Sequence, residues 1–381
     1  MSSPGATDAF APTTVGPPGA QSVEPPPDSR VTRTGRAGRA GVVGRTGGPG
    51  VPGVPGVPGA PGRTAGTGRS PGQVAWDRLR GDRVAIACAV VILFFILVAV
   101  FAPFLTSLQS VDPLTGTQAD PYTTHTELLD LNGFPTEGTS SAHWLGIEKG
   151  LGRDLFARWA YGARPSLVIG FTAAALSTAL GVTFGLVAGY VGGRADRIVS
   201  WLTDFFLSLP LLLLIVAVVP IVELRFGERG SLTAEQTSTI RFWVVMAVLV
   251  TFGWMGLARL VRGEVVSLRE REFVQAARAI GVPTRQILLR EILPNLVGPI
   301  AVSASIAVPA YITAEATLTF LGAGLVEPTA TWGRTIADAQ NSFRSYPLWL
   351  WPPVLSISAL VLALTLLGDA IRDAFDPTTR R

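Results

Sequence analysis

Residues that could ligate a metal ion or form a redox centre are few in this sequence. Cys88 is the single cysteine, which excludes an intrachain disulfide and cysteine-based zinc or iron–sulfur sites. The two histidines, His125 and His143, stand far apart in the chain, whereas a metal site requires several ligands that converge. The sequence therefore predicts no metal site and no cofactor bound by this chain.

Nucleotide hydrolysis would require a phosphate-binding loop of the pattern Gly-x-x-x-x-Gly-Lys-Ser/Thr, in which backbone amides and the lysine surround the phosphates. Lys149 is the one lysine of the chain, and Gly150 follows it. The pattern is therefore absent from the sequence. We expect the chain not to be an enzyme.

Two acidic residues, Asp204 and Asp369, fall near the ends of apolar stretches, as the aspartates of an intramembrane protease would. Such proteases resemble one another in a Gly-x-Gly-Asp motif, and the segment Leu366-Leu367-Gly368-Asp369 lacks its first glycine. A His-Glu-x-x-His zinc motif is also missing from the sequence. We therefore interpret both aspartates as solvated helix ends.

The elements that carry these residues are long and apolar. Hydrophobic residues make up 48% of the 381 residues and charged residues only 15%, which is typical of a membrane protein. Six stretches reach the roughly 20 apolar residues that a helix needs to cross a bilayer. They are residues 84–105, 166–190, 198–222, 242–260, 292–320 and 348–371. The sequence predicts an all-α membrane protein with six transmembrane helices in one domain, residues 76–377.

The first 75 residues are rich in glycine, proline and arginine and contain no long apolar run. Such a segment cannot bury enough surface to offset the entropy of ordering, so we expect a disordered N-terminal tail. Its repeat from Gly50 to Gly62 is interpreted as a flexible spacer. Residues 378–381 are expected to form a short C-terminal tail.

The distribution of basic residues predicts the orientation. Most of the 31 lysines and arginines collect in the N-terminal tail, the loops around 194–197 and 259–290, and the C-terminus. The positive-inside rule then predicts a multi-pass protein of the bacterial cytoplasmic membrane with both termini in the cytoplasm. Because the charges occupy loops between spans rather than one continuous face, we expect membrane lipid and not nucleic acid as a partner.

The cytoplasmic loop 262–294 has its own helix signals. Ser267 and Glu270 form a capping-box pattern at the start of a helix that should run to Ile280. Gly281 can then adopt the left-handed conformation of a helix end, and Pro283 can open a second helix. The loop is predicted to form two short helices, which either dock on another protein or rest on lipid headgroups.

Glu315 is the acidic residue closest to mid-membrane. An ion-coupled secondary transporter usually carries such a charge, and this class is the alternative to a subunit driven by a separate ATPase. Counted from Pro294, however, Glu315 lies roughly 30 Å along a helix, near the outer boundary. We therefore interpret it as a helix-end or gate contact.

The segment 152–164 places aromatic residues on one face and charged residues on the other, so we expect an amphipathic helix at the outer interface. Trp159 and Tyr161 would anchor it. Whether this helix rests on lipid or gates the pathway is left open at this point. The candidate outer gate comprises Gly152, Arg153, Asp154 and Glu315.

Part of the loop 262–294 resembles the Glu-Ala-Ala loop of ABC importer permeases, although Gln275 stands where the family has glutamate. The positions that match are Ala276, Ala277, Gly281, Leu293 and Pro294. The resemblance implies that the loop forms coupling helices that sit in a groove of the ATPase subunit.

Three further stretches, 143–156, 321–333 and 367–377, resemble motifs of the dipeptide and oligopeptide permeases of the DppC/OppC type. The resemblance covers residues 76–377. It implies a type I importer (MetI-like) permease fold that imports di- or oligopeptides together with a second homologous permease, two ATPase subunits and an extracellular peptide-binding lipoprotein. Import of nickel complexes or glutathione by the same family is the alternative.

Overall fold

The computed structural model describes residues 71–114, 116–136, 138–227 and 231–375. Most of the predicted disordered tail and all of the predicted C-terminal tail lie outside these ranges. The predicted boundary at residue 75 needs correction, because it falls inside helix α1, Pro71–Gly81. Ala75 is buried in this helix, which packs against α12, Pro347–Phe375.

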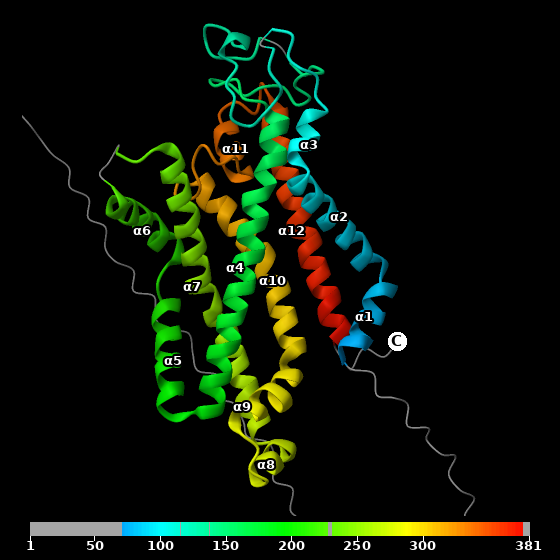
Figure 1. Ribbon diagram of the computed structural model, residues 1–381, viewed down its shortest axis with the longest axis vertical. Helices are drawn as coiled ribbons and strands as arrows, with labels where there is room; N and C mark the ends of the chain where they lie inside the picture. Colours follow the sequence, from blue (N-terminus) through cyan, green and yellow to red (C-terminus); the bar gives the residue numbers. More distant parts are fainter. Residues whose placement is uncertain (1–70, 115, 137, 228–230, 376–381) are drawn as a thin grey trace, which may run out of the picture. The chain divides into compact units, whose positions relative to one another are not determined.

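Helices of very different length build the described part of the chain, in which there is no β-strand (Figure 1). The long ones are α2, Arg83–Val100; α4, Leu155–Val191; α7, Ala234–Arg269; α10, Leu293–Phe320; and α12. The shorter ones are α3, Ala102–Ser107; η1, Thr126–Leu128; α5, Gly193–Leu207; α6, Leu211–Phe226; α8, Glu272–Ala279; α9, Thr284–Gln286; η2, Ile287–Ile292; and α11, Trp332–Ala339.

Five single helices are long and apolar enough to cross a membrane, which confirms five of the predicted spans. The third predicted span is not one helix. It consists of α5 and α6, which meet at an angle of 87°, so the number of spans is six if this pair crosses as a unit. The break has a local cause: Pro210 lacks an N–H group and disfavours helical backbone at Leu209, the residue before it.

Helix α4 contradicts the predicted interfacial helix. Residues 155–164 form its first turns and continue through Pro165 into the second span. Asp154 caps the start, since its side chain accepts a hydrogen bond of 2.6 Å from the Ala157 amide. The face predicted to meet water is covered, and Arg158 is fully buried. We call the described residues of 108–154 (all but 115 and 137), which cover it, the cap segment, and this end of the bundle the cap end (Figure 1).

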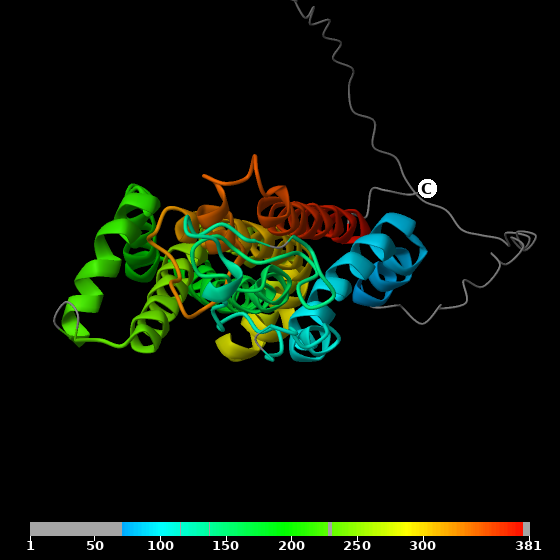
Figure 2. The same cartoon turned by 90° about the horizontal axis from the view of Figure 1, so that it is seen from above.

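Helix α4 is the centre of the bundle, with α7 on one side and α2 and α12 on the other (Figure 2). Its closest neighbour is α7, because a glycine every four residues removes the side chains between them. The three glycines are Gly181, Gly185 and Gly189. A Cβ atom on Gly185 would lie 2.7 Å from Val261 Cβ and 2.8 Å from the carbonyl oxygen of Ala258. This spacing is the small-residue packing typical of membrane helices.

Replacing Gly185 with leucine should therefore force α4 and α7 apart. We expect a loss of stability of about 1–3 kcal/mol, the usual range for overpacking a tight contact. Thermal unfolding of the purified protein in detergent measures this change. Gly256→Leu on α7 is the matched control, because nothing lies within 4 Å of a Cβ atom at that position. Equal unfolding midpoints for the two variants would contradict this packing.

Deletion of residues 2–70 and deletion of residues 2–81 should have different effects. The longer deletion removes α1, in which Arg78 Nη1 donates a hydrogen bond of 3.1 Å to the carbonyl oxygen of Ala374 at the end of α12. Residues 1–70 lack core-forming sequence, so we expect the shorter deletion to leave membrane levels near normal and the longer one to lower them. Quantitative immunoblots of membranes compare the two. Low levels of the shorter protein would show that the tail is required.

Candidate functional site

The segment 262–294 forms a compact projection at the end of the bundle opposite the cap segment, and we call it the coupling segment (Figure 1). Helix α8 lies across this end, beyond α7 and α10. One side of α8 is fixed by burial, since Val274 is fully buried and Ala277 is 8% exposed. Both belong to a hydrophobic cluster completed by Leu186, Val261, Val265, Ile287, Ile292 and Leu296. The segment is therefore a packed extension of the bundle and not a loose loop.

The turn after α8 is set by Gly281, whose φ of +82° confirms the predicted left-handed conformation. The Gly281 amide donates to the carbonyl oxygen of Arg278, and the Val282 amide donates to that of Ala277, each at 3.0 Å. These two bonds are the Schellman pattern of a helix end. Pro283 follows as the N-cap residue of α9, so a second helix does begin after the turn. It is not a short helix, as predicted, because α9, η2 and α10 run without a break from Thr284 to Phe320.

The predicted capping box at Ser267 is wrong. Helix α7 continues through Ser267 to Arg269, and α8 begins only at Glu272. The buried side chains of Val261 and Val265 keep this stretch helical, and packing outweighs a local capping preference. A capping box does exist at the other end of α7, where the side chains and backbone of Thr233 and Gln236 bond reciprocally.

The outward face of α8 is uncovered, and its exposed side chains include the charged Glu272 and Arg278 as well as apolar residues. Phe273 is 41% exposed and Ile280 is 80% exposed, and Ala276 lies between them on the same helical face. Gln275 is also exposed, and its side-chain amide donates to the carbonyl oxygen of Glu270 at 3.2 Å. Exposed apolar side chains on a helix that is anchored by its buried side are compatible with a protein contact surface.

The second half of the coupling segment carries a π-helix, η2, directly before Pro294. The Leu293 amide donates to the carbonyl oxygen of Leu288, five residues back. Because Pro294 has no N–H group, the regular helical ladder cannot continue across it, and the wider turn absorbs this defect. Leu293 is half-buried and Pro294 is exposed at the start of α10. The coupling segment is thus joined without a gap to a spanning helix.

Three of the four candidate gate residues are consecutive in the chain and lie at the cap end. Gly152 has a φ of +69°, and a Cβ atom there would lie 2.4 Å from the carbonyl oxygen of His125. Arg153 and Asp154 follow it and are both buried. Glu315 is elsewhere in α10, where it is fully buried and accepts hydrogen bonds from Ser166 at 2.6 Å and Thr319 at 2.9 Å. It therefore ties α10 to α4.

The centre of the cap end is an ion network that the sequence analysis missed. Arg153 pairs with Glu148 and lies 2.8 Å from Glu327. Arg158 lies 3.4 Å from Glu148 and 2.9 Å from Glu327. Burial alone would raise the pKa of Glu327, but Arg158 and Arg153 outweigh it and hold the pKa below its usual range. The network joins the cap segment, α4 and the loop before α11.

A second polar cluster lies beside this network. His143 Nδ1 is 2.8 Å from an oxygen of Asp154, and its Nε2 is 3.3 Å from an oxygen of Asp112. Burial alone would lower the pKa of His143, but the two carboxylates outweigh it and raise the pKa, which favours the imidazolium form. The ring of His125 lies 5.4 Å away, so the fold brings the two histidines together.

Neither cluster is arranged as a metal centre. Within the ranges that the structure describes, no three His, Cys, Asp or Glu side chains are grouped as they would be around an ion. Paired charges at such distances hold segments together, and their burial makes the removal of one partner costly. The arrangement can keep the cap segment closed over α4, while the coupling segment presents a contact surface at the opposite end.

Apolar helices of spanning length, a closed cap and an exposed projection define a polytopic helical membrane protein. Residues 181–381 match the model of the binding-protein-dependent transport system inner membrane component, and residues 70–127 match that of the N-terminal TM domain of oligopeptide transport permease C. The chain belongs to this family, the permease subunits of ABC importers, and within it to the DppC/OppC type.

Two relatives with known names are permeases of this kind. The chain is 35% identical over 310 residues to the dipeptide transport system permease protein DppC of Bacillus subtilis, covering 81% of this chain and 86% of that protein. It is 36% identical to the glutathione transport system permease protein GsiD of Pectobacterium atrosepticum, covering 81% and 92%. A structure of the MetNI methionine ABC transporter is similar over 56% of this chain and 93% of that one, with 20% identity and a TM-score of 0.43.

Proposed function

We propose that the chain is the membrane-spanning subunit of an ATP-driven importer of di- or oligopeptides. It forms the translocation pathway with a second, homologous permease. Two ATPase subunits, which bind the ATP and Mg²⁺, dock on the coupling segment, and an extracellular binding protein delivers the peptide to the cap end. In this arrangement both termini of the chain lie in the cytoplasm.

The observation that carries the proposal is the rigid coupling segment. Its outward face, on which Phe273 and Ile280 are exposed, is fixed to α7 and α10 through buried Val274 and Ile292. A movement imposed on α8 by a partner is therefore passed to two spanning helices. A loop that only rested on lipid headgroups would need neither this anchoring nor a Schellman turn.

Uptake by the reconstituted transporter tests which substrate it imports. Proteoliposomes that contain both permeases, the ATPases and the binding protein should accumulate a radiolabelled dipeptide in an ATP-dependent manner. Glutathione is the competing cargo, because a glutathione permease is among the relatives. Accumulation of glutathione and not of the dipeptide would assign the transporter to that class. The isolated chain, assayed in parallel, should hydrolyse no ATP.

A further inference from the structure

A groove runs along the surface of α4 where α2 diverges from it. Its volume is about 610 Å³. Helix α2 contributes Ile96, Ala99 and Val100 to its walls, and α4 contributes Leu167, Val168 and Phe171. One charged residue, Arg164, lines its mouth at the cap end. The groove is therefore a mostly apolar surface groove with one threonine, Thr172, in its wall and a single cation at one end.

Arg164 lies at the level where the span of α2 ends. Its Nε donates a hydrogen bond of 2.5 Å to the carbonyl oxygen of Ala99, and its Nη2 donates one of 3.2 Å to that of Val100, the last residue of α2. Because α2 is long enough to cross the hydrocarbon layer, the guanidinium group lies at the boundary between acyl chains and headgroups. The arginine guanidinium can bind a phosphate group through two parallel N–H donors.

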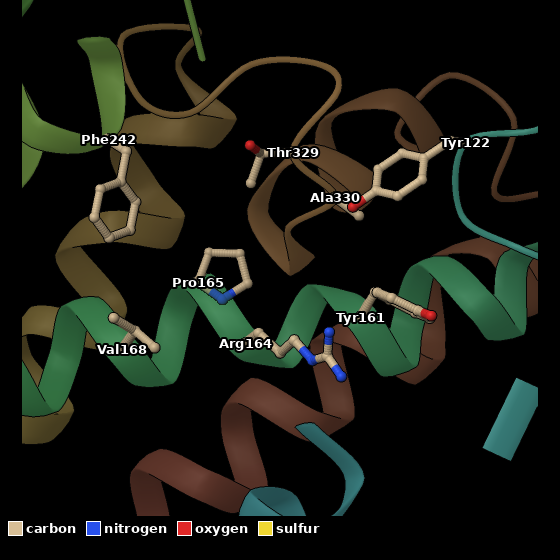
Figure 3. Close-up of a pocket in the computed structure, with 8 residues that line it drawn as sticks. All are labelled: Tyr122, Tyr161, Arg164, Pro165, Val168, Phe242, Thr329 and Ala330. Carbon is tan, nitrogen blue, oxygen red and sulfur yellow. The ribbon is translucent and has the colours of Figure 1, made fainter. Parts of the chain in front are cut away.

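Tyr161 lies one turn from Arg164, and the guanidinium carbon is 4.8 Å from the centre of its ring. Figure 3 shows both side chains on α4, beside a second hollow of about 300 Å³ that shares Arg164 and Val168 with the groove. Within the described residues, Arg164 has no acidic partner, and its two bonds to α2 leave other N–H groups of the guanidinium available. The site therefore offers donors to an anion at headgroup level.

We propose that this groove binds one anionic phospholipid, with its phosphate on Arg164 beside Tyr161 and an acyl chain between α2 and α4. A peptide does not suit the walls, because its backbone N–H and C=O groups would find no partners among Ile96, Leu167 and Phe171. An acyl chain gains little free energy when it moves from the surrounding lipid into an apolar groove. The charge of the headgroup therefore decides the affinity.

The test measures lipid binding to the purified, delipidated protein. Native mass spectrometry detects the bound lipid, and thermal unfolding reports its effect on stability. Phosphatidylglycerol should bind and raise the unfolding midpoint by several degrees more than phosphatidylcholine. Arg164→Gln should weaken phosphatidylglycerol binding at least tenfold and remove the difference between the two lipids. Arg334→Gln, which alters a partly exposed arginine elsewhere at the cap end, should leave it unchanged.

Arg164 also holds the end of α2, so a second variant separates lipid binding from this structural role. Val168→Trp fills the groove and leaves both bonds of Arg164 to α2 in place, and it should remove the selectivity as well. Lipid selectivity that persists in Val168→Trp, or in Arg164→Gln, would overturn the proposal. A further test places a cysteine at this position, Val168→Cys, together with a series of single cysteines in the second permease, in complexes saturated with lipid. A disulfide between the two subunits would also overturn the proposal, because it would identify a protein as the occupant.

Discussion

Replacing Gly281 with valine should uncouple ATP hydrolysis from uptake without reducing the amount of the subunit in the membrane. The backbone at this position has a φ of +82°, which costs a β-branched residue on the order of 1–2 kcal/mol or more. A Cβ atom there meets nothing within 4 Å, so the effect comes from the backbone alone. The turn should relax to negative φ and re-aim α9 and η2 relative to α8.

The spans should insert normally, because their hydrophobicity is unchanged. We expect substrate-stimulated ATP hydrolysis and uptake by the reconstituted complex to fall about tenfold or more. Gly281→Asn is the matched control, because asparagine tolerates the left-handed conformation, and it should retain most of the activity. Near-normal coupled transport by Gly281→Val would exclude docking through this turn and favour a loop that rests on lipid.

Replacing Arg158 with methionine should destabilise the protein more than any exposed charge change. Arg158 is fully buried and lies within 3.4 Å of Glu148 and 2.9 Å of Glu327. Its loss leaves the buried Glu148 with one cationic partner, Arg153, and such broken pairs cost about 3–5 kcal/mol. We expect a large fall in the unfolding midpoint and reduced membrane levels.

The control is Arg259→Met at the coupling end. Arg259 also forms an ion pair, with Asp204, but the two side chains are 55% and 69% exposed. Exposed pairs contribute about 0–1 kcal/mol, so this variant should unfold near the wild-type midpoint. Double variants with Glu327→Gln measure the coupling energy directly. A small effect of Arg158→Met would mean that the network does not hold the cap segment on α4.

The sequence was sufficient for features with local causes. A run of about 20 apolar residues must form a helix in lipid because its backbone groups have no other partners, and five such runs are single helices in the structure. The conformation of Gly281 was equally predictable, since glycine alone adopts positive φ at little cost. The family followed from the motifs around Gln275 and His143, and the comparisons with relatives confirm it.

The break between α5 and α6 was visible only in part. Pro210 indicates that the third span is interrupted, but a proline inside a membrane helix is also compatible with a mild kink. The angle of 87° depends on what α6 packs against, and its buried side chains, Ile215 and Val219, lie against α7. Packing partners of this kind are not encoded in the local sequence.

The arrangement of the cap end could be known only from the tertiary structure. In segment 152–164, charged and aromatic residues lie on opposite faces of a helix. This pattern is the same whether the charged face meets water or other charged side chains. The sequence therefore could not distinguish the fully buried Arg158 from a surface residue. His125 and His143, eighteen positions apart, become neighbours only because the cap segment folds back on α4. Glu327 reaches Arg158 from a loop 169 residues away, and long-range ion pairs leave no periodic signal in a single sequence. Local sterics and hydrophobicity therefore fixed the spans and the coupling turn, whereas charges from distant segments, brought together by burial, determined the cap.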